Sequence, residues 1–252
     1  KIKLGFIGAG FIAQECHLPS FSLNEDCTLF GIADLHYDLA MRIAKRYEIT
    51  NVYKTHKDLL ENEDIDAVVV TLPRQLTYGV VRDCLLAGKH VFTEKPLALN
   101  INNAEELKDL SSKNKLLLQI GYMKRFDLGV VRLKEELLEL YKIDKKPILV
   151  NSSCFMGDSY CNPISAIKPQ KNEKLISSKL ESMPSWLNKK SVIGYENYLN
   201  TFSHVIDLLN FLLESPLELI TSKINDSGFG ITLFSSSETP VELSTMKCNT
   251  GA

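Results

Sequence analysis

Short apolar runs alternate with segments of helical periodicity through the first 121 residues. The run at residues 67–71 is entirely apolar or β-branched, which is typical of a strand buried on both faces of a sheet. The same reasoning predicts strands at residues 3–7, 29–33, 67–71, 90–93 and 116–120, and helices at 12–22, 39–47, 80–87 and 103–114. Strands that alternate with helices form parallel sheets with right-handed crossovers. We therefore expect residues 1–121 to form a doubly wound α/β domain.

Residues 122–252 follow a different pattern, in which helices are followed by a run of strands. Helices are predicted at 128–141 and 201–213, and strands at 148–155, 217–225, 230–234 and 240–246. Residues 157–190 are polar and rich in Ser, Lys, Asn and Pro, which indicates a functional or poorly ordered loop. This pattern predicts an α+β second domain. The sequence ends directly after its last predicted strand, so we expect this domain to be incomplete at its C-terminus.

Composition excludes several classes of protein. The 29 Lys and Arg residues nearly balance the 31 Asp and Glu residues, so the net charge is −2 and gives no support to a nucleic-acid or acidic membrane surface. With 44% hydrophobic and 24% charged residues the chain is not intrinsically disordered. No apolar run approaches the roughly 20 residues of a membrane span, and no signal peptide is recognised at the N-terminus. The six cysteines are scattered without a Cys-x-x-Cys pair. We expect free thiols, no metal site and a cytoplasmic protein.

The segment Gly8–Ala13 has the spacing of a dinucleotide-binding fingerprint with alanine in the third position. It follows a predicted strand and opens a predicted helix, so bound phosphates would lie at the positive end of that helix. Asp34 follows Ala13 by 21 positions at the end of the second strand, where a carboxylate accepts both ribose hydroxyls. The neighbouring Leu35 and His36 supply no arginine for a 2′-phosphate, although a protonated His36 could contact one. We therefore expect NAD rather than NADP. The alternative to any dinucleotide site here is a glycine turn that binds no ligand.

Several further segments resemble one family of enzymes. The segment Ala87–Pro96 contains Glu94-Lys95-Pro96, and His17-Leu18-Pro19, Gly121–Asp127 and His204–Asp207 follow the same family pattern in the right order. The chain is therefore similar to the Gfo/Idh/MocA oxidoreductases. The resemblance implies a Rossmann domain, a second domain with an open, mostly antiparallel sheet, and homo-oligomers that pair through that sheet. It also implies hydride transfer between a nicotinamide cofactor and a hydroxyl carbon of a sugar or cyclic polyol.

Lys95 is the first candidate catalytic residue, because it follows the strand at 90–93, at the edge where open α/β sheets place ligands. Its ammonium group could hydrogen-bond the reacting oxygen, although a lone lysine is more often a solvated surface residue. We expect the cofactor to contact Gly8, Gly10, Phe11, Ile12, Asp34, Thr71, Pro73, Glu94 and Lys95.

His204 is the second candidate, as the general base, and the resemblance places the base on this helix. Asn200 and Asp207 lie on nearly the same helical face, and Asp207 is expected to orient the helix or the histidine. Arg125 would bind a substrate anion or make an interdomain ion pair, and Tyr122 should face the substrate. The expected substrate-binding residues are Lys95, Tyr122, Arg125, Asn200 and His204. The loop lysines Lys168, Lys171, Lys174 and Lys179 could contact a sugar-linked diphosphate, or simply be solvated.

Two departures from the family pattern keep other functions open. Asn200 stands where polyol dehydrogenases of this family often have aspartate, and it cannot raise the basicity of His204 through a charge. The stretch from Pro73 to Thr77 lacks the Asn and His found in many relatives, and it would place Arg74 and Thr77 near the nicotinamide. A nucleotide-linked sugar is therefore as good a substrate as a simple polyol. The alternatives are an inactive NAD-binding sensor and a glycosidase that works on bound NAD.

Overall fold

A computed structural model describes residues 1–157, 166–169, 180–213 and 215–248 of the 252-residue chain. The described residues divide into two compact units. The first comprises residues 1–121 together with 166–169 and 180–184, and the second comprises the remainder. Residues 166–169 and 180–184 come from the long polar segment, and the sequence did not predict that they join the first unit.

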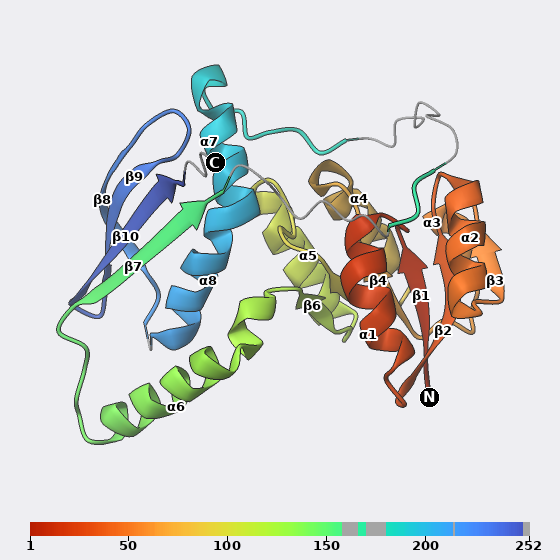
Figure 1. Ribbon diagram of the computed structural model, residues 1–252, viewed down its shortest axis with the longest axis horizontal. Helices are drawn as coiled ribbons and strands as arrows, with labels where there is room; N and C mark the ends of the chain where they lie inside the picture. Colours follow the sequence, from red (N-terminus) through yellow and green to blue (C-terminus); the bar gives the residue numbers. More distant parts are fainter. Residues whose placement is uncertain (158–165, 170–179, 214, 249–252) are drawn as a thin grey trace. The chain divides into compact units, whose positions relative to one another are not determined.

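The first unit is built on a parallel sheet of six strands in the order β3-β2-β1-β4-β5-β6 (Figure 1). The strands are β1 (Ile2–Ile7), β2 (Cys27–Ala33), β3 (Asn51–Tyr53), β4 (Ala67–Val70), β5 (His90–Thr93) and β6 (Leu118–Ile120). Between them lie α1 (Leu18–Ser22), α2 (Tyr37–Tyr47), α3 (His56–Leu60), α4 (Arg74–Leu86) and α5 (Ile101–Lys113). The expected doubly wound Rossmann-type sheet is confirmed.

Two apolar layers cover the faces of this sheet, because successive strand residues point to opposite sides. On one face, Phe6 and Val69 pack with Leu18 of α1 and Ile43 of α2. On the other, the cluster includes Val68 of β4, Val81 and Leu85 of α4, and Leu107 of α5. These layers hold the carboxyl ends of β1, β2, β4 and β5 along one edge of the sheet.

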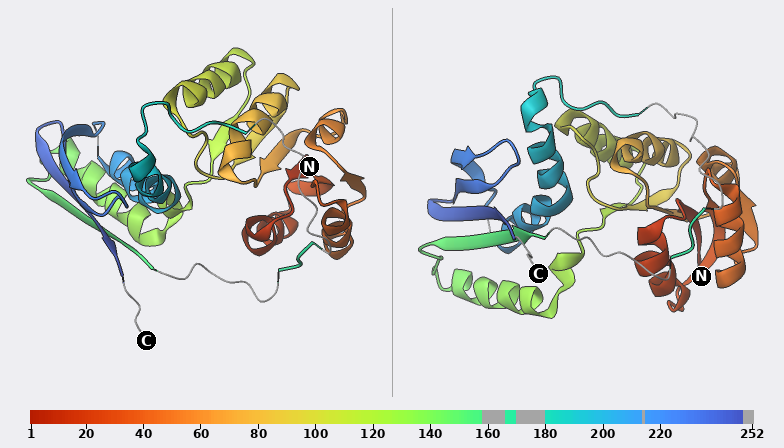
Figure 2. Two further views of the ribbon diagram at one scale, coloured as in Figure 1. Left: turned by 90° about the horizontal axis from the view of Figure 1, so that it is seen from above. Right: turned by 45° about the horizontal axis from the view of Figure 1, so that its top comes forward.

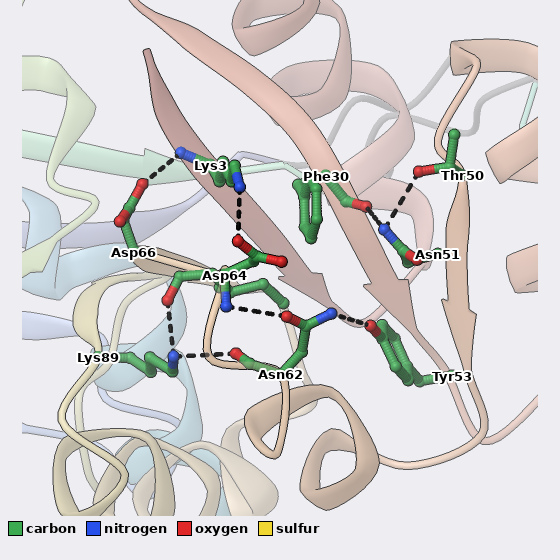
Figure 3. Close-up of polar contacts among 10 residues, drawn as sticks. Lys3, Phe30, Thr50, Asn51, Tyr53, Asn62, Asp64, Asp66 and Lys89 are labelled. Atoms are coloured by element: carbon green, nitrogen blue, oxygen red, sulfur yellow. Dashed lines mark hydrogen bonds and ion pairs between the residues drawn. The ribbon is translucent and has the colours of Figure 1, made fainter.

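The opposite, amino edge of the sheet is closed by polar contacts (Figure 3). Lys3 at the start of β1 donates from its ammonium group to Asp64 and from its backbone to Asp66, each at 2.7 Å. The buried Lys89 donates to the carbonyls of Asn62 and Ile65. Lys3 and Lys89 thus bind the starts of β1 and β5 to the loop before β4. Both lysines have a structural role and lie away from the carboxyl edge.

Three differences from the sequence prediction stand out among the elements of the first unit. The short β3 and α3 were not predicted, since three and five residues are too few to show a period. Helix α4 begins at Arg74 and not at residue 80. Its first turns carry polar side chains, so the apolar period that predicts a helix is recognisable only from residue 80 onward. The predicted helix at 12–22 is present, but its middle, Ala13–His17, is π-helical. That wider turn precedes Pro19, which lacks the N–H of a regular α-helical bond.

The second unit contains a four-stranded sheet in the order β7-β10-β9-β8, formed by β7 (Val150–Met156), β8 (Glu218–Ile224), β9 (Gly230–Ser236) and β10 (Thr239–Lys247). Only the β7–β10 pair is parallel, so the sheet is mixed and mostly antiparallel, as expected. Its helices are α6 (Leu128–Lys142), α7 (Val192–Asn197) and α8 (Ser203–Leu212). Leu209 of α8 and the adjoining Leu213 pack with Val241 of β10, so α8 lies along one face of the sheet. Figure 2 shows the ribbon of this unit from two further sides. Helix α7, missed from the sequence, joins α8 through the π-helical turn Tyr198–Phe202.

Candidate functional site

The glycine turn after β1 has the shape that the fingerprint predicts. Gly8 has a φ of 97°, and a Cβ there would lie 2.4 Å from the carbonyl oxygen of Thr71, so no other residue fits. A Cβ at Gly10 would meet no atom within 4 Å. Packing therefore does not require glycine at position 10, whereas close approach of a ligand to the backbone would. Ala13 is completely buried, which agrees with close packing of helix and strand.

Asp34 at the end of β2 is tied to this turn. Its carboxylate accepts hydrogen bonds from the backbone N–H of Ala9 and from that of His36, each at 2.8 Å. An ionised carboxylate has about four acceptor positions, so two such bonds leave capacity for ribose hydroxyls. Asp34 thus shapes the turn and remains able to accept hydrogen bonds from a ligand.

The helix after the turn begins at Phe11 and Ile12, which are half-buried. Gln14 donates from its backbone to the carbonyl of Gly10 at 3.1 Å, so the helical bonding starts within the fingerprint. The N–H groups of the first turn of a helix have no intrahelical partner and attract anions. Phe11 and Ile12 therefore lie where the fingerprint predicts the phosphates of a bound dinucleotide.

Glu94 and Lys95 follow β5 at the carboxyl edge of the same sheet. The carboxylate of Glu94 lies 2.7 Å from Nε2 of His17 and accepts the backbone N–H of Lys95 at 3.2 Å. The peptide bond between Lys95 and Pro96 is cis. The structure thus shows Glu94 joining β5 to the helix after the glycine turn, a contact that the sequence did not predict.

Thr71 and Pro73 follow β4, the strand between β1 and β5. The Thr71 hydroxyl donates to the carbonyl of Gly8 at 2.9 Å. Pro73 precedes α4, which begins at Arg74, and Thr77 of this helix is only 3% exposed. All the expected cofactor residues therefore lie in the first unit, at the carboxyl ends of β1, β2, β4 and β5.

The second unit brings Tyr122 and His204 together. Their rings meet edge to face with centroids 6.0 Å apart, and His204 is 7% exposed at the start of α8. Burial raises the pKa of the Tyr122 hydroxyl, and the charge of Asp207 adds to this effect. Asn200 lies in the π-helical turn directly before α8, and such turns are frequent at functional sites.

Arg125 forms an ion pair with Asp207 through two hydrogen bonds, one of them 2.7 Å from Nε. Both residues belong to the second unit, so this ion pair lies within one unit and is not the interdomain pair suggested as one alternative for Arg125. Asp207 engages Arg125 by this two-point contact, which raises the pKa of the guanidinium. The guanidinium also lies over the rings of Tyr122 and Phe211. Tyr122, Arg125, Asp207 and His204 therefore form one connected cluster.

Lys95 belongs to the first unit and His204 to the second. The expected cofactor residues thus form one group in the first unit, and the candidates Tyr122, Arg125, Asn200 and His204 belong to the second.

Comparison with known proteins identifies the family to which the first unit is similar. Residues 2–122 match the Gfo/Idh/MocA family, described as an oxidoreductase family with an NAD-binding Rossmann fold. Residues 2–122 belong to this family. The expectations of an NAD-binding Rossmann domain and of this oxidoreductase family are confirmed.

Relatives of this family extend the likeness over the second unit. An inositol 2-dehydrogenase/D-chiro-inositol 3-dehydrogenase of Shouchella clausii is 28% identical over 224 residues, covering 86% of this chain and 54% of that enzyme. The chain spans about half the length of the curated relatives it matches.

Two solved structures have the same fold. A myo-inositol dehydrogenase from Lactobacillus casei, in complex with NAD(H) and myo-inositol, has a TM-score of 0.71 at 21% identity and covers 97% of this chain and 67% of that one. KijD10, a 3-ketoreductase from Actinomadura kijaniata bound to TDP-benzene and NADP, has a TM-score of 0.71 at 22% identity, with 96% and 68% covered.

Other sequence expectations fall outside this site. Lys168 lies in the first unit, while Lys171, Lys174, Lys179 and Cys161 lie outside the described residues. No cysteine within the described ranges forms a disulfide. Among the described residues no group of three or more His, Cys, Asp or Glu side chains is arranged to hold a metal ion. In the same part of the chain, no helix is long and apolar enough to cross a membrane.

Gln14 is a residue of this domain whose contacts could not be predicted from the fingerprint. Its side chain is 4% exposed and donates to the carbonyl of Ala9 at 2.8 Å. The available signal was a polar side chain directly after the apolar residues Phe11, Ile12 and Ala13. A buried amide needs hydrogen-bonding partners, so this position invited the question of what it binds.

Proposed function

We propose that the protein is an NAD-dependent dehydrogenase of a sugar, cyclic polyol or nucleotide-linked sugar. One observation carries this proposal: Lys95 follows β5 on the edge that also presents the glycine turn and Asp34, within a domain of an NAD-binding oxidoreductase family. Open α/β sheets bind their ligands outside the carboxyl ends of the strands. The lysine therefore lies on the edge where a cofactor would bring its reactive ring.

The residues present fit a dinucleotide. The open side of Gly10 admits a pyrophosphate, the N–H groups at Phe11 and Ile12 would bind its oxygens, and Asp34 has acceptor capacity for ribose hydroxyls. The segment formed by Thr71 and Pro73, with Glu94 and Lys95, would border the nicotinamide half. A 2′-phosphate would be repelled by Asp34, which favours NAD over NADP.

When bound, the cofactor would supply a nicotinamide able to accept hydride from the substrate carbon. Lys95 donates a hydrogen bond from its ammonium group to the reacting oxygen. The imidazole of His204 takes the hydroxyl proton, so the substrate carbon loses hydride and its C–O bond becomes a carbonyl. The reverse reaction returns the proton from His204 to the oxygen.

The connected cluster in the second unit supports the proposed base. Asp207 lies three residues after His204 on α8 and is paired with Arg125, while the ring of Tyr122 lies against the imidazole. Tyr122 thus acts as a positioning residue that limits how the ring of His204 can turn, and Asp207 holds Arg125, which lies in the same short segment as Tyr122. Asn200 would contribute an uncharged hydrogen-bonding group to the substrate.

The relatives indicate which substrates to test. An inositol dehydrogenase and a structure containing myo-inositol support a cyclic polyol, while a ketoreductase bound to a TDP compound supports a nucleotide-linked sugar. The experiment is a panel of inositols, free sugars and nucleotide sugars, incubated with NAD or NADP, with reduced cofactor measured by absorbance. We expect turnover with NAD in one of these classes.

An NADH titration and a set of glycosides, added to this panel, separate the other functions. Tight NADH binding without turnover would favour the sensor. Hydrolysis of a glycoside with no net NADH would favour the glycosidase on bound NAD. Failure to bind either cofactor would contradict the proposal in every form.

A further inference from the structure

The side chain of Gln14 joins two distant parts of the chain. Its amide nitrogen donates to the carbonyl of Ala9 at 2.8 Å and to that of Ile167 at 3.0 Å. Its amide oxygen accepts the backbone N–H of Ile167 at 2.7 Å. Gln14 thus pairs with Ile167 as a strand pairs with its neighbour, across 153 residues of sequence. Both amide hydrogens are used, so a buried polar group is fully satisfied.

Two further contacts hold the segment 166–169 in this position. The side chain of Ile167 packs against the apolar layer that contains Phe6 and Leu18. Arg42 of α2 donates from its guanidinium to the carbonyl of Lys168 at 2.8 Å. This set of contacts, made by Gln14, Arg42 and Ile167, is called the clasp below.

The clasp acts on the glycine turn through one residue. The N–H of Ala9 is bound by Asp34 and its carbonyl is bound by Gln14, so both polar groups of this peptide position are fixed from opposite sides. A fixed turn costs less ordering when a ligand binds to it. The carbonyl of Ala9 is also held by an amide, which prevents it from turning its negative end toward a phosphate.

We propose that Gln14 is a positioning residue of the cofactor site, through which the docked segment 166–169 keeps the glycine turn in its binding shape. This inference rests on the proposed function, because it concerns the affinity of the same turn for a dinucleotide. Residues 166–169 belong to the connection between β7 and α7, which leads on to the helix that carries His204. Loss of the clasp therefore weakens cofactor binding without altering Lys95, His204, Gly10 or Asp34.

The clasp itself is tested without any nucleotide, by hydrogen–deuterium exchange at the Ile167 amide. In wild-type protein this amide is bound to a buried oxygen and should exchange slowly. Gln14→Met keeps the side-chain length but has no donor and only a weakly accepting sulfur, so it should lose this protection. Gln119→Met is the matched control, since Gln119 is exposed on β6 and its side chain bonds to the neighbouring Ile120 carbonyl in the contacts described.

Cofactor affinity is then measured by NADH titration of the same proteins. Of the three side-chain hydrogen bonds lost in Gln14→Met, the one to the Ala9 carbonyl acts directly on the glycine turn. One buried hydrogen bond changes an equilibrium by about tenfold, so we expect Kd for NADH to rise about tenfold in Gln14→Met and to stay unchanged in Gln119→Met. Ile167→Pro provides a second route, because it removes the N–H that Gln14 accepts and leaves the Gln14–Ala9 bond in place. It should weaken binding by a smaller factor, roughly threefold.

The two measurements distinguish failure of this inference from failure of the proposed function. Rapid exchange at Ile167 in wild-type protein would overturn the clasp, whatever the protein binds. Slow exchange that is lost in Gln14→Met, with unchanged NADH affinity, would overturn the positioning role alone. A wild-type protein that binds no NADH would contradict the proposed function and the role of Gln14 within it.

Discussion

The residues at the carboxyl edge of the first sheet each serve the protein's own backbone as well as the proposed ligand. Asp34 accepts the N–H of Ala9, Thr71 donates to the carbonyl of Gly8, and Glu94 accepts the N–H of Lys95. Such contacts fix the turns before any ligand arrives, which lowers the cost of binding. Substitutions here therefore change shape and affinity together, and the two glycines of the fingerprint offer a way to separate them.

Gly10→Ala should leave folding unchanged and weaken NADH binding, because the added methyl group meets no protein atom but occupies the open side where a pyrophosphate would approach. We expect Kd for NADH to rise at least tenfold with the melting temperature unaltered. Gly8→Ala is the contrast: its Cβ would lie 2.4 Å from the Thr71 carbonyl oxygen at a φ of 97°, so this variant should lose stability as well. Equal NADH affinity in Gly10→Ala and wild-type protein would contradict the assigned turn.

At the scale of elements, the sequence predicts what repeats and misses what is local. The strand at residues 67–71 and the helix at 103–114 have enough apolar positions to be recognised, and both are present as β4 and α5. The short helix α3 is instead specified by a capping box between Thr55 and Asp58, a two-residue signal without a period.

The candidate site follows the same division. Gly8, Gly10 and Asp34 could be predicted because their spacing is set by a strand, a turn and a helix in sequence. The pairing of Gln14 with Ile167 joins residues 153 positions apart, and that of Arg125 with Asp207 spans 82. No local sequence pattern encodes such contacts, because they depend on which distant segments pack against each other in the folded chain.

Glu181 anchors another returning segment and gives the first unit a dependence on pH. Its backbone donates to the Gln75 carbonyl at 2.8 Å, and one carboxyl oxygen accepts the N–H of Leu99 and the side-chain amides of Asn100 and Asn103. The carboxyl group is buried, and burial raises its pKa above the ordinary value of 4.5. The folded state therefore holds the proton more tightly than the unfolded chain does.

The free energy of unfolding should consequently fall as pH rises from about 4.5 through the raised pKa of Glu181. Glu181→Gln keeps an acceptor oxygen and cannot ionise, so its unfolding free energy should lose this part of the decline. Urea unfolding at a series of pH values measures the slope. Glu105→Gln, on the exposed side of α5, is the control and should keep the wild-type slope. Parallel slopes in wild-type protein and Glu181→Gln would contradict the effect of burial.

At the scale of the whole molecule, the second unit presents a sheet whose two faces differ. One face packs against α8, while apolar side chains project from the other, among them Phe155, Ile231 and Met246 with exposed fractions of 60%, 49% and 38%. Register places Phe155 beside Met246 across β7 and β10, so these side chains form a continuous patch. Exposed apolar patches of this kind mark association surfaces. We propose that copies of the chain pair through this face.

Ile231→Glu should therefore reduce the mass seen in sedimentation velocity to that of a monomer. The added carboxylate would lie opposite Lys223 on β8 within its own chain, so it should not harm the sheet, yet pairing through this face would take its charge out of water against the apolar side chains of the second copy. Leu128→Glu places the same charge on an exposed apolar residue of α6 and should not change the mass. Identical masses for wild-type protein and Ile231→Glu would contradict assembly through this face.

The measurement that tests the central claim most directly compares wild-type protein with Lys95→Ala in two assays, NADH binding and NADH formation with the substrate found by the panel. Removing a group that assists proton transfer lowers rates by about 10²–10⁴, whereas Lys95 contributes one contact among many to the cofactor. The account predicts a loss of turnover of that size, with Kd for NADH changed by no more than a few fold. Turnover that survives in Lys95→Ala would contradict the catalytic assignment.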